Sequence, residues 1–240
     1  MDAKAHWEQV YRTKPATDVS WYQPEATLSV DLIKRVVSDL ATPIIDVGGG
    51  ASTLADGLLE AGYSNLTVLD LAGSALAAAQ ERLGKRASRV KWVEANVLSA
   101  AFVEGQYGLW HDRAVFHFLT DRTDRERYVA QSQRAVRQGG HVIVASFGPD
   151  GPPRCSGLDV VRYTPASMHA EFGESFSLLK SVREAHHTPS GAIQAFVYCL
   201  CRVRMRGPRA APVIARLGWR ALRFHLNVAV LDRHRSATDS

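Results

Sequence analysis

Cysteine, methionine and long apolar runs are all scarce in this chain of 240 residues. Cys155, Cys199 and Cys201 form neither a disulfide framework nor a zinc-site spacing, so we expect buried thiols in a reducing cytoplasm and no metal. No stretch approaches the roughly 20 apolar residues of a membrane helix. The start of the chain is polar and lacks the apolar core of a signal peptide. These absences predict a cytoplasmic protein without a membrane span.

An excess of positive charge is also missing until the end of the chain. Residues 202–240 contain nine Arg, two Asp and neither Lys nor Glu, a net charge of +7, whereas the whole chain carries +5. The preceding residues are therefore slightly acidic and show no basic face, which argues against nucleic acid as a partner. Apolar residues are mixed with Arg in the tail, a pattern that fits weak contact with a membrane surface or an acidic partner. A flexible extension without function is the alternative.

Apolar periodicity switches repeatedly between strand-like and helix-like stretches. The runs with strand character are residues 43–48, 66–71, 90–96, 107–115 and 141–147. Amphipathic helices are expected between them, one ending at Gly84 and another, over 122–140, at a glycine pair. Strands that alternate with helices at this spacing predict an α/β fold with a doubly wound, mostly parallel sheet.

The two ends of this region differ from its middle. Residues 176–187 and 192–203 are extended runs joined by a T-P-S-G turn, and they predict an antiparallel hairpin at the edge of the sheet. Residues 4–12 and 25–40, ahead of the first strand, are expected to be helical. The chain then divides into three parts: an N-terminal helical segment at 1–40, a domain at 41–203 and the basic extension at 204–240.

The most distinctive short motif is D-V-G-G-G, residues 46–50, at the end of the first strand. Ligands of open parallel sheets bind beyond the carboxyl ends of the strands, and glycine there lets the backbone approach closely. A dinucleotide fingerprint needs glycine where Thr53 stands, and no Gly-Lys-Ser/Thr run follows for a phosphate loop. Asp46 would repel a pyrophosphate but suits an ammonium or another cation.

Two more polar residues end neighbouring strands. Asp70, at the end of the second strand, can accept both hydroxyls of a ribose. Asn96 closes the third strand, where its amide can read the edge of an adenine. These positions outline a ligand with a ribose, a base and a positive charge but no phosphate. S-adenosylmethionine fits that outline, and NAD does not.

These motifs, with the R-Q-G-G before the fifth strand, resemble the ordered motifs of class I S-adenosylmethionine-dependent methyltransferases. The resemblance covers about residues 20–203 and implies a Rossmann-like methyltransferase fold. It also implies an enzyme with S-adenosylmethionine as cofactor and S-adenosylhomocysteine as product. The implied cofactor-binding residues are Asp46, Gly48, Gly49, Gly50, Asp70, Leu71, Asn96 and Val97.

The N-terminal segment is similar to that of a subgroup of bacterial methyltransferases in which this segment closes over the cofactor. The similarity rests on H-W-E-Q-V-Y at 6–11 and W-Y-Q at 21–23. It implies that Trp21 and Tyr22 cover the site, where an aromatic face beside a sulfonium gains on the order of 1 kcal/mol or more. Ordinary packing at the entry of a helix is the alternative.

The fourth strand's end is expected to adjoin the methyl donor. His117 lies just past that strand and is the first candidate for a general base or substrate contact, because a neutral imidazole accepts a proton near pH 7. Packing of a His-Phe pair against the core is the alternative. Asp112 is a candidate for a hydrogen bond to cofactor or substrate, and Arg113 is expected to pair with it. His111 points to the opposite side and is expected to be structural.

The loop at 148–163, rich in glycine and proline, is expected to form a substrate lid. Cys155 and Arg162 are its distinctive members, and an inert buried thiol is the alternative for Cys155. His186 and His187 stand at the hairpin turn, where adjacent side chains face opposite ways. One of them, taken as His187, is a substrate-contact candidate.

The leading functional hypothesis is methylation of a small molecule at a thiol, a chalcogen or an amine. The absence of a basic face and the presence of a lid and a cover segment favour it. The first alternative is a protein methyltransferase acting on lysine, because the opening loosely resembles some enzymes of that kind. A non-catalytic module that only binds the cofactor is the alternative from another class. A monomer or a dimer is expected.

Overall fold

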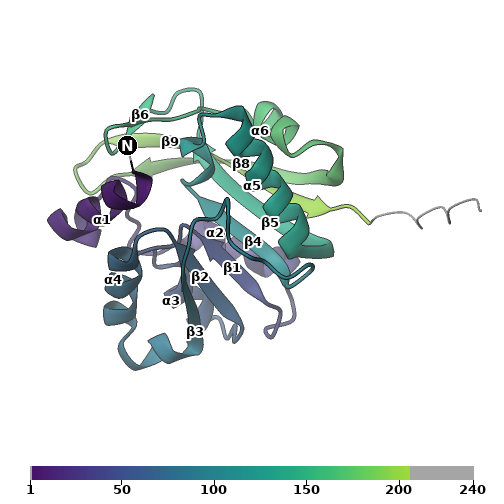
Figure 1. The fold of residues 1–240 in the computed structure, drawn as a ribbon, viewed down its shortest axis with the longest axis horizontal. Coiled ribbons are helices and arrows are strands. Elements are labelled where there is room, and N and C mark those ends of the chain that lie inside the picture. Colours follow the sequence, from purple (N-terminus) through teal and green to yellow (C-terminus); the bar gives the residue numbers. More distant parts are fainter. Residues whose placement is uncertain (1, 206–240) are drawn as a thin grey trace, which may run out of the picture. The chain divides into compact units, whose positions relative to one another are not determined.

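A computed structural model describes residues 2–205 of the chain. Strands from this region form a seven-stranded sheet in the order β3-β2-β1-β4-β5-β9-β8 (Figure 1). The strands are β1 Ile44–Val47, β2 Leu66–Asp70, β3 Val90–Glu94, β4 Tyr107–Arg113, β5 Val136–Phe147, β8 Phe176–His187 and β9 Ile193–Val203. β1 to β5 run parallel, and β9 is antiparallel to both β5 and β8. The predicted mixed sheet with a C-terminal hairpin is confirmed.

Helices cover both faces of the sheet. They are α1 Ala3–Thr13, α2 Thr27–Val36, α3 Leu54–Glu60, α4 Gly73–Leu83, α5 Arg122–Ala135 and α6 Pro165–Phe172. Short 3₁₀ segments occupy Ala16–Asp18, Gly84–Arg89, Phe116–Phe118 and Gly173–Ser175. Leu32, Leu58 and Leu76 bring α2, α3 and α4 into one core, whereas Tyr128 and Met168 bring α5 and α6 into the other. The sheet therefore separates two apolar layers, as the doubly wound pattern predicts.

The pleat of the central strands decides which layer each side chain enters. Successive residues of a strand point to opposite faces. Ile44 and Leu109 belong to the core under α2, α3 and α4, whereas Ile45 and Trp110 belong to the core under α5 and α6. β1 pairs in register with β4, so that Asp46 lies beside His111.

The helix expected over 122–140 is shorter than predicted. α5 ends at Ala135, and Val136 already pairs with Tyr107 in the sheet. The register shifts between Tyr107 and Leu109, and Gly139 has a φ of 74°. The glycine pair thus accommodates an irregularity within the long β5 rather than the end of a helix.

Three other features differ from the sequence predictions, namely the length of one helix and two elements that were not predicted. α2 spans ten residues, fewer than the predicted stretch 25–40. The loop at 148–163 contains a small antiparallel pair, β6 Arg154–Cys155 and β7 Leu158–Asp159. α6 was not predicted at all, although Thr164 caps it and Pro165 opens it, which is a recognised start signal.

No helix within residues 2–205 is long and apolar enough to cross a membrane. The basic extension predicted at 204–240 falls outside the described residues from position 206 on.

Candidate functional site

A cavity of about 350 Å³ lies at the carboxyl ends of β1, β2, β3 and β4. α1 lies beside α4 at this end of the sheet (Figure 1) and contributes to the cavity wall. The sequence-predicted residues on the wall are Trp21, Gly48, Asp70, Leu71, Asn96 and Val97. A smaller hollow of about 40 Å³ shares Trp21 and Gly48 with the cavity and adds Tyr22, Asp46 and Gly49. The structure thus brings together the strand-end residues that the sequence singles out.

The glycine corner allows the backbone to lie against other parts of the wall. Gly48 has a φ of 64°, and a Cβ built on it would lie 1.9 Å from Val115 Cγ2. Gly50 lines neither hollow, but a Cβ on it would lie 2.7 Å from Asp70 Oδ2. Both positions therefore need glycine for lack of space as well as for their positive φ.

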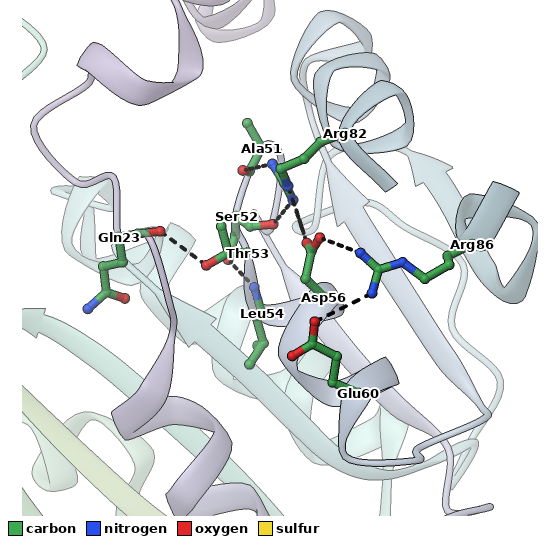
Figure 2. A network of polar contacts seen from close by, with 9 residues as sticks. All are labelled: Gln23, Ala51, Ser52, Thr53, Leu54, Asp56, Glu60, Arg82 and Arg86. Carbon is green, nitrogen blue, oxygen red and sulfur yellow. Dashed lines mark hydrogen bonds and ion pairs between the residues drawn. The ribbon is translucent and has the colours of Figure 1, made fainter. Parts of the chain in front are cut away.

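Arg82 of α4 fixes the loop that follows the glycines. It donates to the carbonyl oxygens of Ala51, at 2.7 Å, and Ser52, at 2.6 Å, and it pairs with Asp56 at 2.8 Å. Figure 2 shows this guanidinium between the loop and the start of α3. The Thr53 hydroxyl donates to the Gln23 carbonyl oxygen at 3.1 Å (Figure 2). The position where a dinucleotide fingerprint has glycine therefore links the loop to the N-terminal segment.

Asp70 is buried at the end of β2. Its Oδ1 accepts the Ala72 N–H at 2.8 Å. Burial raises the pKa of Asp70 to about 6, with the nearby Asp46 as a smaller cause. Ionisation of a buried carboxylate is costly unless hydrogen-bond donors surround it, and a pair of ligand hydroxyls at this wall would supply them.

The side chain of Asn96, on the same wall, is oriented by a hydrogen bond to its own loop. Its Oδ1 accepts the Leu98 N–H at 2.9 Å, which leaves the side-chain NH₂ to donate to a ligand. Val97 beside it is buried and lines the same cavity. This polar and apolar pair suits the edge and the face of a flat base.

Aromatic rings from the N-terminal segment cover the cavity. Trp7 makes edge-to-face contacts with Trp21, at 5.7 Å between centroids, and with Phe118, at 5.0 Å. Trp21 Nε1 donates to the Tyr11 hydroxyl at 3.3 Å. Ala3, Trp7 and Tyr11 all line the cavity because residues four apart share one face of a helix. Sequence reasoning missed Trp7 and Tyr11, although this spacing was available.

Polar contacts hold α1 in this position. Glu8 Oε1 accepts the Gly73 N–H at 2.7 Å, at the first residue of α4. A carboxylate is favourable there because the N-terminal end of a helix carries partial positive charge. Lys4 forms an ion pair with Glu94 at the end of β3.

The segment Ser20–Gln23 is held by the C-terminal hairpin. His186 Nε2 donates to the Ser20 carbonyl oxygen at 2.8 Å, and Gln23 Nε2 donates to Glu184 Oε1 at 2.9 Å. Arg113 Nη1 donates to the Trp21 carbonyl oxygen at 3.0 Å, and its Nη2 pairs with Glu184 Oε2 at 3.3 Å. Glu184 therefore joins the cover segment to β4 and β8.

Arg113 does not pair with Asp112, contrary to the sequence prediction. Its Nε donates to the Tyr198 hydroxyl at 2.8 Å, and its guanidinium lies 4.2 Å from the Phe196 ring centroid. Neighbouring residues on a strand point to opposite faces, so these two side chains diverge.

The structure removes Asp112 from the site. Its side chain is fully buried and accepts hydrogen bonds from the backbone N–H groups of Val115 and Phe116 and from the Tyr128 hydroxyl. Burial raises its pKa to about 6. Asp112 lines neither hollow, and its contacts fix the turn after β4 instead.

His117 is likewise a core residue rather than a wall residue. It is fully buried between Phe118 and Phe147, whose N–H donates to its Nδ1 at 3.5 Å. Burial, with a smaller effect from Arg113, lowers its pKa to about 3. Such a ring is a poor proton acceptor near neutral pH, and it lines neither hollow.

Of the substrate-contact candidates, Cys155 alone lines the cavity, from the β6–β7 pair. Burial raises the pKa of its thiol to about 11. Arg162 donates instead to the carbonyl oxygens of Pro149 and Gly151 within its own loop. His187 is exposed at the end of β8, and it is His186 that turns inward.

Cys199 and Cys201 are free thiols buried in the same core, as expected from their alternation. Within residues 2–205, no group of three or more His, Cys, Asp or Glu side chains is arranged to hold a metal ion.

Comparisons with known proteins agree with this geometry. Residues 44–140 match the family model of a methyltransferase domain. Residues 44–140 thus carry a methyltransferase domain, and the fold is that of S-adenosylmethionine-dependent methyltransferases. No curated protein sequence matches it.

Solved structures of similar fold include several methyltransferases. The N-methyltransferase NodS from Bradyrhizobium japonicum WM9, in complex with S-adenosyl-L-homocysteine, has a TM-score of 0.62 and 18% identity, over 82% of this chain and 97% of that one. A methyltransferase from Anabaena variabilis ATCC 29413 has a TM-score of 0.65 and 16% identity, over 85% and 96%. A third structure is described with the conversion of a disulfide bond into a thioacetal group during echinomycin biosynthesis. It has a TM-score of 0.66 and 16% identity, over 84% of this chain and 92% of that one.

The residues present fit S-adenosylmethionine. Asp70 is a buried acceptor suited to the ribose hydroxyls, and the cradle at Gly48 admits no Cβ. Trp7 and Trp21 supply aromatic surface for a sulfonium. Asp46 borders the smaller hollow, where a carboxylate suits the ammonium of the methionine part.

We expect Gly48→Ala to abolish detectable binding of S-adenosylhomocysteine in calorimetry, because its Cβ meets Val115. Overpacking of this kind costs about 1–3 kcal/mol, beyond the strain of a positive φ. Gly84→Ala is the matched control, since Gly84 has a φ of 55° and nothing within 4 Å of its Cβ position. Equal loss of affinity in both variants would show that backbone strain at a positive φ, and not the contact with Val115, weakens binding.

We expect His117→Asn to lose less stability than the wild type between pH 7 and pH 5. The unfolded histidine binds a proton below its ordinary pKa of about 6.5, whereas the buried ring, with a pKa of about 3, does not. Acid therefore favours the unfolded wild type by about 2 kcal/mol at pH 5. Asn can still accept the Phe147 N–H, and Asp70 and Asp112 are common to both proteins.

Urea unfolding at the two pH values measures this difference. Parallel changes in the free energy of unfolding for the two proteins would contradict the assigned burial of His117.

We expect Arg113→Lys to weaken S-adenosylhomocysteine binding about tenfold. An ammonium lacks the planar fork that reaches Trp21, Glu184 and Tyr198 together. Arg122→Lys is the control, because the Arg122 side chain is 83% exposed. Unchanged affinity in the Arg113 variant would mean that the cover does not depend on this contact.

Proposed function

We propose that this methyltransferase acts on a small-molecule nucleophile, a thiol, a chalcogen or an amine, by in-line displacement. The observation that carries the proposal is the cover that Trp7, Tyr11 and Trp21 provide over the cavity of about 350 Å³. Ligand pockets span about 300–1,000 Å³, so this volume is at the lower end of that range. The cofactor would itself fill much of this volume, so the space left beneath the cover suits a compact acceptor better than a peptide segment.

When bound along Gly48, Asp70 and Asn96, S-adenosylmethionine would supply an electrophilic methyl group: the acceptor's lone pair would form a bond to its carbon as the carbon–sulfur electron pair returned to sulfur. The chain's contribution is to hold the acceptor in line and to exclude water. Phe118, Leu119 and Leu158 form an apolar part of the wall suited to this.

The wall also constrains the chemistry of the acceptor. No histidine lines the larger cavity within the described residues, and the imidazole expected to act as base is buried elsewhere. The Cys155 thiol, with its pKa raised to about 11, stays protonated and does not compete as a nucleophile. An acceptor that brings its own lone pair near neutral pH, such as a thiolate or an unprotonated amine, meets this constraint.

Two proteins of similar fold are described with chemistry at nitrogen or sulfur. NodS is an N-methyltransferase, and the protein described with echinomycin biosynthesis is associated with conversion of a disulfide bond into a thioacetal. Their low sequence identity makes them support for the fold, and their nitrogen and sulfur chemistry is compatible with the acceptors proposed here.

Incubation of the protein with methyl-labelled S-adenosylmethionine and a cell extract separated by size tests the proposal. We expect label in the small-molecule fraction, and none there with Gly48→Ala. Label confined to protein bands would favour a protein methyltransferase instead. Cofactor binding without transfer to any fraction would favour a non-catalytic module.

A further inference from the structure

Asp46, the acid of the glycine motif, belongs to a buried chain of three polar side chains. His111 Nδ1 lies 2.7 Å from Asp46 Oδ1, and His111 Nε2 lies 2.9 Å from Ser29 Oγ. The three residues are 5%, 2% and 1% exposed in the order Asp46, His111, Ser29. They come from β1, β4 and α2, and the in-register pairing of Asp46 with His111 places them together.

The donor and acceptor roles follow from the chemistry of the groups. A carboxylate can only accept, so His111 donates from Nδ1 to Asp46. In the tautomer that carries its proton at Nδ1, Nε2 accepts the Ser29 hydroxyl. Ser29 thereby fixes the ring, and the ring fixes one oxygen of the carboxylate. A histidine held from its far side in this way orients its partner, as residues around metal ligands and catalytic bases do.

The second oxygen of Asp46 faces the ligand side. A Cβ built on Gly49 would lie 2.4 Å from Asp46 Oδ2, so this oxygen lies directly against the glycine corner. Asp46, Gly49 and His111 all line the small hollow that adjoins the main cavity. One oxygen of the carboxylate therefore points towards His111, and the other points towards the glycine motif, where it suits an ammonium.

We propose that His111, itself fixed by Ser29, is a positioning residue that aims Asp46 at the ammonium of the cofactor's methionine part. Sequence reasoning assigned His111 no part in the site because it points away from Asp112. That direction is the one that matters, because Asp46 is on the same face of the sheet. The inference concerns cofactor binding and does not depend on which acceptor is methylated.

Two ligands that differ at the ammonium separate this role from a merely structural one. S-adenosylhomocysteine carries the amino acid part, whereas 5′-methylthioadenosine keeps the adenosine and the sulfur but lacks it. We expect His111→Phe, which fills the space of the ring without its hydrogen bonds, to weaken S-adenosylhomocysteine binding about tenfold or more. Binding of 5′-methylthioadenosine should change less than about twofold, since Asp70 and Asn96 are untouched.

His111→Asn is the conservative variant, because its amide can still donate to Asp46. We expect it to recover part of the affinity for S-adenosylhomocysteine. Ser29→Ala should lose less affinity for S-adenosylhomocysteine and should likewise leave 5′-methylthioadenosine binding unchanged. It replaces His111→Phe in the test if that variant does not fold. Asp46→Asn should reproduce the selective loss of His111→Phe.

Calorimetric titration of each variant with both ligands gives the result. A selective loss for S-adenosylhomocysteine supports the proposal. Equal losses for both ligands would show that His111 acts only through general packing. Unchanged affinities for both would show that the orientation of Asp46 does not depend on His111. Either result overturns the proposal. Label transfer to small molecules is a separate readout, so failure of the proposed acceptor class would be seen independently.

Discussion

The covered site depends on one interaction, the largely buried ion pair between Arg113 and Glu184. The side chain of Arg113 is 9% exposed and that of Glu184 is 16% exposed, so both charges are largely removed from water. Such a pair is favourable only when the remaining donors and acceptors are satisfied. One of those partners is the Trp21 carbonyl oxygen, which belongs to the cover segment. The cover and the ion pair therefore stabilise each other, because opening the cover would strip a partner from a buried charge.

This dependence gives the antiparallel hairpin a role at the site. The parallel strands provide Asp46, Asp70 and Asn96 at their ends, and they also contact the cover through Glu94 and Arg113, of which Arg113 depends on partners from the hairpin. β8 and β9 add Glu184, His186 and Tyr198, which contact the segment Ser20–Gln23 or the Arg113 that binds it. Glu8 holds α1 from the other side, on the start of α4. The cover thus has two sets of anchors, one on the hairpin and one on the opposite part of the sheet.

The extent to which the sequence predicts this site follows from the range of its contacts. Asp46, Gly48 and Asp70 could be found because strand ends of a parallel sheet meet at one edge, which periodicity alone reveals. Arg113 with Glu184, or His186 with Ser20, could not, since each contact joins segments far apart in sequence. The errors at His117 and Asp112 have another cause. Proximity to a strand end does not say which layer a side chain enters, and both enter the core.

The two kinds of wall in this site suit different parts of the cofactor. In the proposed reaction the ribose would keep its hydrogen bonds and the ammonium its charge, and the buried carboxylates of Asp70 and Asp46 suit these two parts. The sulfonium alone would lose its charge, and the aromatic side chains of Trp7 and Trp21 line the cavity in which we propose that it binds. Attraction to their faces exists only while the sulfur is positive. The carboxylates would then hold cofactor and product alike, whereas the cover would favour the cofactor, with its positive sulfur, over the product, whose sulfur is neutral, and this difference would assist release after transfer.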